Sequence, residues 1–217
     1  MQDSIEICEI SHHFGTASER IKLFHGLSCT ISAGSALAIV GPSGAGKSSL
    51  LSIAAGLEMP AAGAVRFTID GARVDALTMR ANSGFIFQQF HLLPELDAIG
   101  NLALPLRLKG NRHAFDIAAR WLERLGLQHR ARHRPHQLSG GEQQRVAVAR
   151  AFVTAPRFIF ADEPTGNLDR ASALQVMELI AQINRDEGTT FLISTHDEKI
   201  AATCKRQIVV GDGVVTG

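Results

Sequence analysis

A glycine-rich run, Gly41-Pro-Ser-Gly-Ala-Gly-Lys-Ser48, fits the pattern G-x-x-x-x-G-K-[ST] at every fixed position. Glycines let backbone N–H groups turn towards phosphate oxygens, and the helix expected after the run adds the positive end of its dipole. The pattern assigns Lys47 to the β- and γ-phosphates of a nucleotide and the Ser48 hydroxyl to Mg²⁺. The alternative, a glycine-rich turn without a ligand, leaves the complete pattern unexplained. The residues expected at the phosphates are Gly41, Pro42, Ser43, Gly44, Ala45, Gly46, Lys47, Ser48 and Ser49.

Two adjacent acids, Asp162 and Glu163, follow the apolar run Phe158–Ala161. Ligands of open α/β sheets bind at the carboxyl ends of the strands, so both acids should lie near the phosphate site. We interpret Asp162 as a partner of Mg²⁺. Successive residues of a strand point to opposite faces, so Glu163 should lie on the other side, where it would polarise a water for attack on the γ-phosphate. A solvated turn also carries paired acids, and the glycine-rich run upstream is what favours catalysis.

The segment Leu138-Ser-Gly-Gly-Glu-Gln-Gln-Arg145 opens a predicted helix. Its first turn offers unpaired N–H groups and a hydroxyl, which together indicate a second site for an anion. One chain cannot easily bring two such sites to a single nucleotide. The sequence therefore predicts that two chains pair.

On these segments the chain resembles the ABC ATPases, whose signature reads LSGGQ or a close variant. Gly41–Ser48 resembles the Walker A loop of that family, and Phe158–Glu163 resembles its Walker B strand. Gln88 resembles the Q-loop glutamine, Gly166–Asp169 the D-loop, and His196 the switch histidine. The motifs occur in the family's order over nearly the whole chain. The resemblance implies hydrolysis of ATP with Mg²⁺, by two cassettes that pair head to tail around two ATP molecules.

The roles of several residues follow from this resemblance alone. Ser139, Gly140 and Gly141 would bind the ATP held by the partner cassette, and Asp169 would lie at the nucleotide in the D-loop. A histidine such as His196 is by itself more often an ordinary surface residue, and the neighbouring motifs favour the switch role. The implied catalytic residues are Glu163, His196, Gln88 and Lys47. The implied Mg²⁺ residues are Ser48, Gln88 and Asp162.

The family stacks adenine on an aromatic ring upstream of Walker A, and that ring is often a tyrosine. This chain has 11 Phe and one Trp but no Tyr. Phe14, in the run His12-His-Phe-Gly15, is the candidate at that position, because a ring face is sufficient for stacking. A core or edge phenylalanine is the alternative interpretation.

Residues 87–94 (FQQFHLLP) and 161–169 (ADEPTGNLD) resemble one branch of the family in particular. That branch includes lipoprotein-releasing and macrolide-exporting cassettes and the cell-division cassette. There the stretch after the Q-loop contacts a membrane subunit, which would place Phe90, Leu92 and Leu93 in a docking groove. The alternative is that these side chains are ordinary core of the helical segment.

The branch implies a separate integral membrane permease and a role in export or lipoprotein release. A regulatory or mechanical switch of the cell-division type, without substrate transport, is the alternative. Relatives often carry Glu-Asn where this chain has Gly100-Asn101, which leaves the identity of the membrane partner open. The implied location is peripheral, on the cytoplasmic side of the inner membrane, with membrane contact only through the partner.

The elements that must position these residues alternate between apolar runs and helical stretches, as in α/β proteins with a parallel sheet. The predicted strands are Ser35–Val40, Gly84–Phe87, Arg157–Ala161, Thr190–Ser194 and Gln207–Val210. Alternating isoleucines from Ile5 to Ile10 predict a small antiparallel layer in the first 34 residues. Helices are predicted from Ser49, from about Gly141 until shortly before Pro156, and over the stretch that ends near Gly188.

We therefore expect a P-loop NTPase fold of the α/β class, with a RecA-like parallel sheet, an N-terminal antiparallel β-subdomain and a helical insert typical of ABC proteins. One domain would span residues 1–217. Residues about 1–87 and 155–217 would form the ATPase core and β-subdomain, and about 88–154 the helical signature subdomain.

Composition narrows the alternatives. Lys and Arg number 22 and Asp and Glu 21, so nothing indicates a nucleic-acid partner. The basic segment His129–His136 could be a nucleic-acid patch or a histidine metal cluster, but a solvated connector is favoured. Three scattered cysteines indicate reduced thiols in a cytosolic compartment, and no apolar stretch reaches the roughly 18 residues of a membrane helix. A GTPase lacks support because there is no N-K-x-D motif, and a DNA-repair ABC ATPase would need long coiled coils between the Walker motifs.

Overall fold

Apolar runs without polar alternation form the strands of the main sheet, as expected for strands covered on both faces. The computed structural model describes residues 3–16, 19–211 and 214–216. Among these residues the sheet has six strands in the order β10-β9-β3-β8-β7-β6, and only β10 is antiparallel to its neighbour. The strands are β3 (Ala36–Val40), β6 (Ser83–Phe87), β7 (Phe158–Asp162), β8 (Thr190–Thr195), β9 (Arg206–Gly211) and β10 (Val214–Thr216). The five predicted strands are confirmed.

A second, antiparallel sheet has the order β2-β1-β4-β5. It consists of β1 (Ser4–Thr16), β2 (Glu19–Ser32), β4 (Ala62–Ile69) and β5 (Ala72–Val74). The antiparallel layer predicted for the first 34 residues is therefore confirmed in β1 and β2. The sheet also recruits β4 and β5 from beyond the phosphate loop, which the sequence analysis did not foresee.

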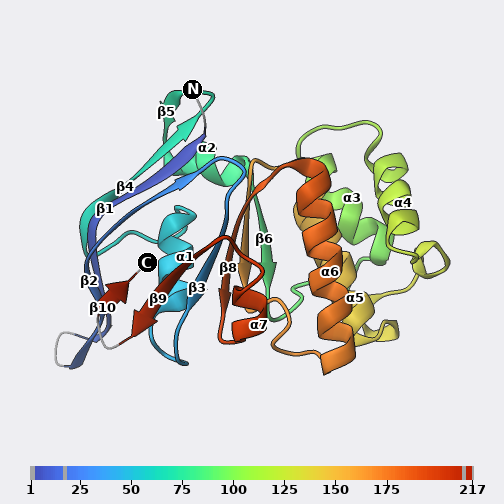
Figure 1. Ribbon diagram of the computed structural model, residues 1–217. Coiled ribbons are helices and arrows are strands. Elements are labelled where there is room, and N and C mark those ends of the chain that lie inside the picture. Colours follow the sequence, from blue (N-terminus) through green and yellow to red (C-terminus); the bar gives the residue numbers. More distant parts are fainter. Residues whose placement is uncertain (1–2, 17–18, 212–213, 217) are drawn as a thin grey trace.

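Helices cover both faces of the main sheet (Figure 1). Helix α1 (Lys47–Ala54) lies between the two sheets, while α5 (Gly140–Phe152) and α6 (Arg170–Glu187) lie on the opposite side of the main sheet. The core between the sheets includes Ile5, Leu50 and Phe160, and the core under α5 and α6 includes Val148 and Ile180. The helices of these layers are α1 (Lys47–Ala54), α2 (Ala76–Ala81), α6 (Arg170–Glu187) and α7 (Glu198–Ala201).

A further group of helices, which includes α5, has a hydrophobic core of its own that contains Leu102, Leu122 and Val146. The group comprises α3 (Ala98–Leu108), α4 (Ala114–Arg124), the 3₁₀ turns η1 (Gln128–Arg130) and η2 (Pro135–Gln137), and α5 (Gly140–Phe152). Asn101 is fully buried and binds the loop before α3 through the backbone of Leu93, Leu96 and Asp97. The asparagine thus fixes the segment that follows the Q-loop.

Helix ends agree with the sequence signals. Helix α6 ends at Gly188, whose φ of 64° is left-handed, and α5 ends before Pro156 as predicted. Gly100 lies in the first turn of α3, where Asp97 accepts a hydrogen bond from its N–H at 2.8 Å. In the part of the chain that the structure describes, no helix has the length and apolar character needed to cross a bilayer.

Candidate active site

The glycine-rich run lies between β3 and α1, and the helix begins at Lys47. Gly46 has a φ of 95°, and a Cβ there would lie 2.9 Å from Cβ of Leu23, so only glycine fits. The Lys47 side chain is 5% exposed, and its Nζ donates to the carbonyls of Gly41 at 3.1 Å and Pro42 at 3.0 Å. The loop therefore closes around a buried ammonium group that faces the place where phosphates are expected.

Asp162 ends β7 and joins hydroxyls from two other elements. Ser48 Oγ donates to Asp162 Oδ1 at 2.9 Å, and Ser194 Oγ, at the end of β8, donates to the same oxygen. Parallel pairing explains the meeting, because Asp162 lies opposite Ser194 in the register of β7 and β8. A hydroxyl and a carboxylate are hard oxygen donors of the kind that Mg²⁺ prefers.

Glu163 lies one residue beyond the end of β7 and departs from strand geometry. Its φ is 43°, which is uncommon for a residue with a side chain. Its N–H donates to the carbonyl of Ser194 at 3.1 Å and is 3.3 Å from the Ser194 hydroxyl. Its carboxylate lies 3.5 Å from Lys47 Nζ and 3.4 Å from Nδ1 of His196. The left-handed turn overrides strand alternation, so Glu163 faces the same pocket as Asp162 rather than the other side as expected.

These groups line a pocket of about 500 Å³ at the carboxyl ends of β6 and β7. Gln88 follows β6 directly and enters the pocket, where its amide donates to Asn167 Oδ1 at 3.2 Å. Asn167 returns a bond to the Gln88 carbonyl at 3.1 Å. The predicted site residues among those that line the pocket are Ser43, Gly44, Gly46, Lys47, Ser48, Ser49, Gln88, Asp162 and Glu163.

The signature segment lies elsewhere, at the start of α5. Ser139 is the N-cap of this helix and forms a capping box with Glu142: the Glu142 N–H donates to Ser139 Oγ at 3.3 Å, and the Ser139 N–H donates to Glu142 Oε2 at 2.8 Å. A Cβ on Gly141 would lie 3.2 Å from Ser172 Oγ in α6. The predicted signature residues Ser139, Gly140 and Gly141 are not among those that line the phosphate-loop pocket.

Asp169 also lies outside that pocket lining. It is the N-cap of α6, and its carboxylate accepts from the N–H groups of Ala171 and Ser172, each at 3.0 Å, and from Ser172 Oγ at 2.6 Å. The Ser172 hydroxyl and these N–H groups hold the pKa of Asp169 below its usual range. Phe14 is part of β1 and lies opposite Ile21, but its side chain is outside the described residues, so adenine stacking there stays a prediction.

Comparison with known proteins decides between the possible P-loop families. A family model described as ABC transporter matches residues 24–166. The chain belongs to the ABC transporter family. Two dimeric solved structures of MJ0796 are similar to it over 98% of this chain and 97% of that one, with 34% identity and a TM-score of 0.85. One is described as a bacterial ABC transporter cassette, and the other as a post-hydrolysis state bound to ADP and Pi.

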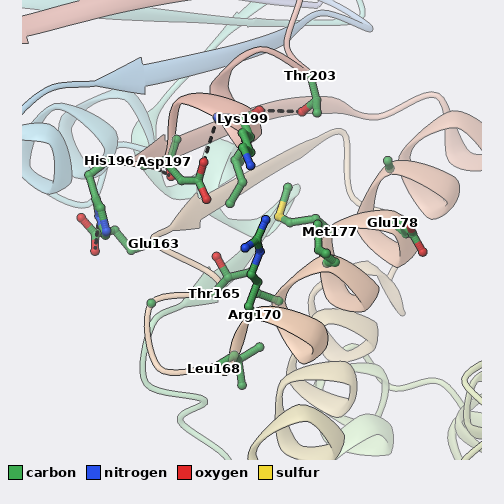
Figure 2. A pocket seen from close by; sticks show the side chains of 16 residues that line it. Glu163, Thr165, Leu168, Arg170, Met177, Glu178, His196, Asp197, Lys199 and Thr203 are labelled. Atoms are coloured by element: carbon green, nitrogen blue, oxygen red, sulfur yellow. Dashed lines mark hydrogen bonds and ion pairs between the residues drawn. The ribbon is translucent and has the colours of Figure 1, made fainter.

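The chain is thus an ATP-binding cassette with ATPase activity and the P-loop fold expected from its sequence. A second pocket of this cassette, of about 710 Å³, lies between α6 and α7. Figure 2 shows Glu163 and His196 side by side at one end of it, with Met177 and Arg170 on the α6 side and Lys199 on the α7 side. Glu163 lines both pockets, which places His196 next to the phosphate-loop pocket.

Several residues that order this cassette's site were not among the predicted ones. Ser194 connects Asp162 to the backbone of Glu163, and Asn167 fixes Gln88. Arg150 of α5 donates to the carbonyls of Phe90 and His91, and so holds the stretch after the Q-loop. A serine at the carboxyl end of a fully buried strand was the available signal for Ser194.

Proposed function

We propose that this cassette is the ATPase subunit of a membrane transport complex, and that it hydrolyses ATP at an interface between two copies of itself. The main observation in support of this proposal is that one pocket is lined by Lys47, Ser48, Gln88, Asp162 and Glu163. The signature segment lies apart from that pocket on α5. A nucleotide that needs both therefore takes the second from another chain.

In this proposal the phosphate loop and Lys47 hold the β- and γ-phosphates, and Phe14 stacks on adenine. Glu163 accepts a proton from the attacking water, because its carboxylate opens into the pocket beside Lys47. His196 contacts the γ-phosphate and orients Glu163, from which its Nδ1 is 3.4 Å away. Gln88 positions the water. Asp169 lies on the D-loop that faces the partner.

The donor set of the pocket fits Mg²⁺. Ser48 and Asp162 present a hydroxyl and a carboxylate 2.9 Å apart, and the Gln88 amide lines the same pocket. We assign these three residues to the ion. When bound, Mg²⁺ would neutralise charge that develops on the β- and γ-phosphate oxygens.

Two copies would be held together by ATP, with Ser139, Gly140 and Gly141 of each contacting the nucleotide of the other. The dimeric structures of MJ0796, 34% identical to this chain, support this arrangement. Hydrolysis removes the shared contacts and releases the copies, and that motion is the output to the membrane partner.

The membrane partner would dock on the helical segment at residues about 88–154, which we propose as a subdomain apart from the ATPase core of about 1–87 and 155–217. The separate core of α3, α4 and α5 supports this division. Leu93 is exposed beside the half-buried Leu92 and Phe90, which supports a docking groove after the Q-loop. With the motifs at 87–94 and 161–169, this favours a permease of the lipoprotein-releasing or macrolide-exporting branch, at the cytoplasmic face of the inner membrane.

The test is Glu163→Gln, which keeps the size of the side chain but removes its basicity. We expect hydrolysis to fall by about 10²–10⁴-fold, as when a general base is lost, while ATP binding persists. The variant should form a stable dimer with ATP and Mg²⁺ that is absent with ADP, measured by sedimentation velocity. A variant that hydrolyses ATP at the normal rate would refute the assignment of Glu163, and one that stays monomeric with ATP would refute the shared site.

A further inference from the structure

The signature segment carries an acid inside its own anion site. Glu142 is in the first turn of α5, its side chain is 15% exposed, and its Oε2 accepts the N–H of Ser139 at 2.8 Å. The backbone N–H of Ser139 above all, then the Ser139 side chain and Arg130, hold the pKa of Glu142 below its usual range. The carboxylate is therefore ionised at neutral pH. An uncompensated negative charge here would repel the phosphates that the segment is proposed to bind.

Arg130 supplies the compensating charge from outside the helix. Its Nε donates to Glu142 Oε1 at 3.1 Å, on the carboxylate oxygen that the capping bond does not use. Arg130 NH1 is also 3.2 Å from Nε2 of His133, which must accept, because a guanidinium only donates. The backbone N–H of His133 in turn donates to the Arg130 carbonyl at 2.8 Å. These contacts hold the guanidinium in one orientation.

Arg132, two residues further along the chain, is not bonded to the signature turn in this way. Arg132 is 84% exposed and reaches Asp97 at 3.4 Å, whereas Arg130 is 37% exposed. The basic segment His129–His136 is therefore more than the solvated connector expected from its composition, because one of its members is bonded to the signature turn. Among the described residues, no group of three or more His, Cys, Asp or Glu could hold a metal, so the segment gains no support as a histidine cluster.

We propose that Arg130 is a positioning residue for ATP-driven pairing of two cassettes, which neutralises Glu142 so that the signature turn keeps its capping box and still attracts phosphate. This inference rests on the proposed function. Glu142 caps the helix through one oxygen, and Arg130 cancels its charge through the other. Replacing the acid by glutamine would keep the cap, because Gln also serves at the third position of a capping box.

The experiment places Arg130→Gln, Glu142→Gln and the double variant in the full-length Glu163→Gln chain, with Arg132→Gln as the matched control. The measurement is the dimer dissociation constant with ATP and Mg²⁺, at low and high NaCl. We expect Arg130→Gln to weaken the dimer by about tenfold, as for an unpaired like charge at an interface. The double variant should recover the parent value. The Arg130→Gln defect should shrink at high salt, because screening weakens a repulsion between charges.

Binding of a fluorescent ATP analogue to the isolated chain should be the same in all variants, since Arg130 acts on the partner's nucleotide. An Arg130→Gln chain that pairs as well as Arg132→Gln would overturn the inference. A defect that the double variant does not relieve would overturn it as well, because it would show a structural role. A parent chain that fails to pair with ATP would instead refute the proposed function, and the inference with it.

Discussion

Ser194→Ala tests whether the serine at the end of β8 organises Asp162 and Glu163, the two acids that we propose act in hydrolysis. The hydroxyl donates to Asp162 Oδ1, and its oxygen is 3.3 Å from the N–H of Glu163. Ser194 is fully buried, so water does not readily replace the hydroxyl that the substitution removes. The Ser194 carbonyl still accepts from Glu163 at 3.1 Å in the alanine variant. The substitution therefore loosens Asp162 and leaves the N–H of Glu163 with one acceptor.

The size of the effect follows from the charge on the acceptor. A hydrogen bond to a charged group contributes about 1.5–3 kcal/mol to stability. Ser48 remains as a second donor to Asp162, so we expect the lower part of that range, about 1.5 kcal/mol. We expect a similar loss in the transition state, which corresponds to a kcat about tenfold lower.

The assay is steady-state ATP hydrolysis together with urea denaturation, and Ser83→Ala is the matched control. The Ser83 hydroxyl donates to the carbonyl of Met79 at 2.8 Å, at the opposite end of the sheet. The control should lose about 0.5–1.5 kcal/mol of stability and keep its kcat, since its bond is neutral and remote. If Ser194→Ala and Ser83→Ala hydrolyse ATP at the same rate, Ser194 does not organise the acids.

Two further predictions concern stability. Gly84→Ala would place a Cβ 2.2 Å from the carbonyl oxygen of Ala151. The free energy of unfolding, measured in urea, should therefore fall by at least about 2 kcal/mol. The control Gly211→Ala has open space around the new Cβ and should change this free energy by less than about 0.5 kcal/mol. Glu142 has a lowered pKa, so its contribution is present above the pKa of the unfolded chain and is lost as the pH falls through the folded value. The stability difference between the parent and Glu142→Gln should therefore be constant at neutral pH and diminish in acid, and a difference independent of pH would contradict this account.

The sequence was sufficient for those parts of the site that depend on local pattern. Walker A lies between a buried strand and a helix, as its glycines and Lys47 require, and the parallel strands fall where unbroken apolar runs predict them. Asp162 lies at the carboxyl end of β7, as expected, and there it meets Ser48, which is 114 residues away in the sequence. Such long-range meetings are predictable because parallel strands place their carboxyl ends at one edge.

Other features depend on tertiary contacts that no local pattern encodes. Strand β4 joins the N-terminal sheet by pairing with β1; Val65, Phe67 and Ile69 alternate with polar residues, but that alternation does not identify the strand with which they pair. The left-handed turn at Glu163 reverses the side predicted by strand alternation, because its N–H is bound to Ser194. The bond from Arg130 to Glu142 connects residues 12 apart through a 3₁₀ turn and a helix cap. From composition alone, Arg130 is only one of several basic residues in the segment His129–His136.

The register of the main sheet explains why the proposed catalytic groups line one pocket while the signature residues do not. Asp162 lies opposite Ser194 in β8 and opposite Phe87, the residue before Gln88, in β6. A slip of one residue in either pairing would exchange side chains between the cores on the two faces of the sheet, so the packing of both cores fixes these neighbours. The signature turn belongs to a helix whose far face packs in the core of α3 and α4. Helix α5 also contributes Val148 and Phe152 to the core under the main sheet, so the placement of the signature depends on both cores, whereas the neighbours within the phosphate-loop pocket depend on the pairing of the strands.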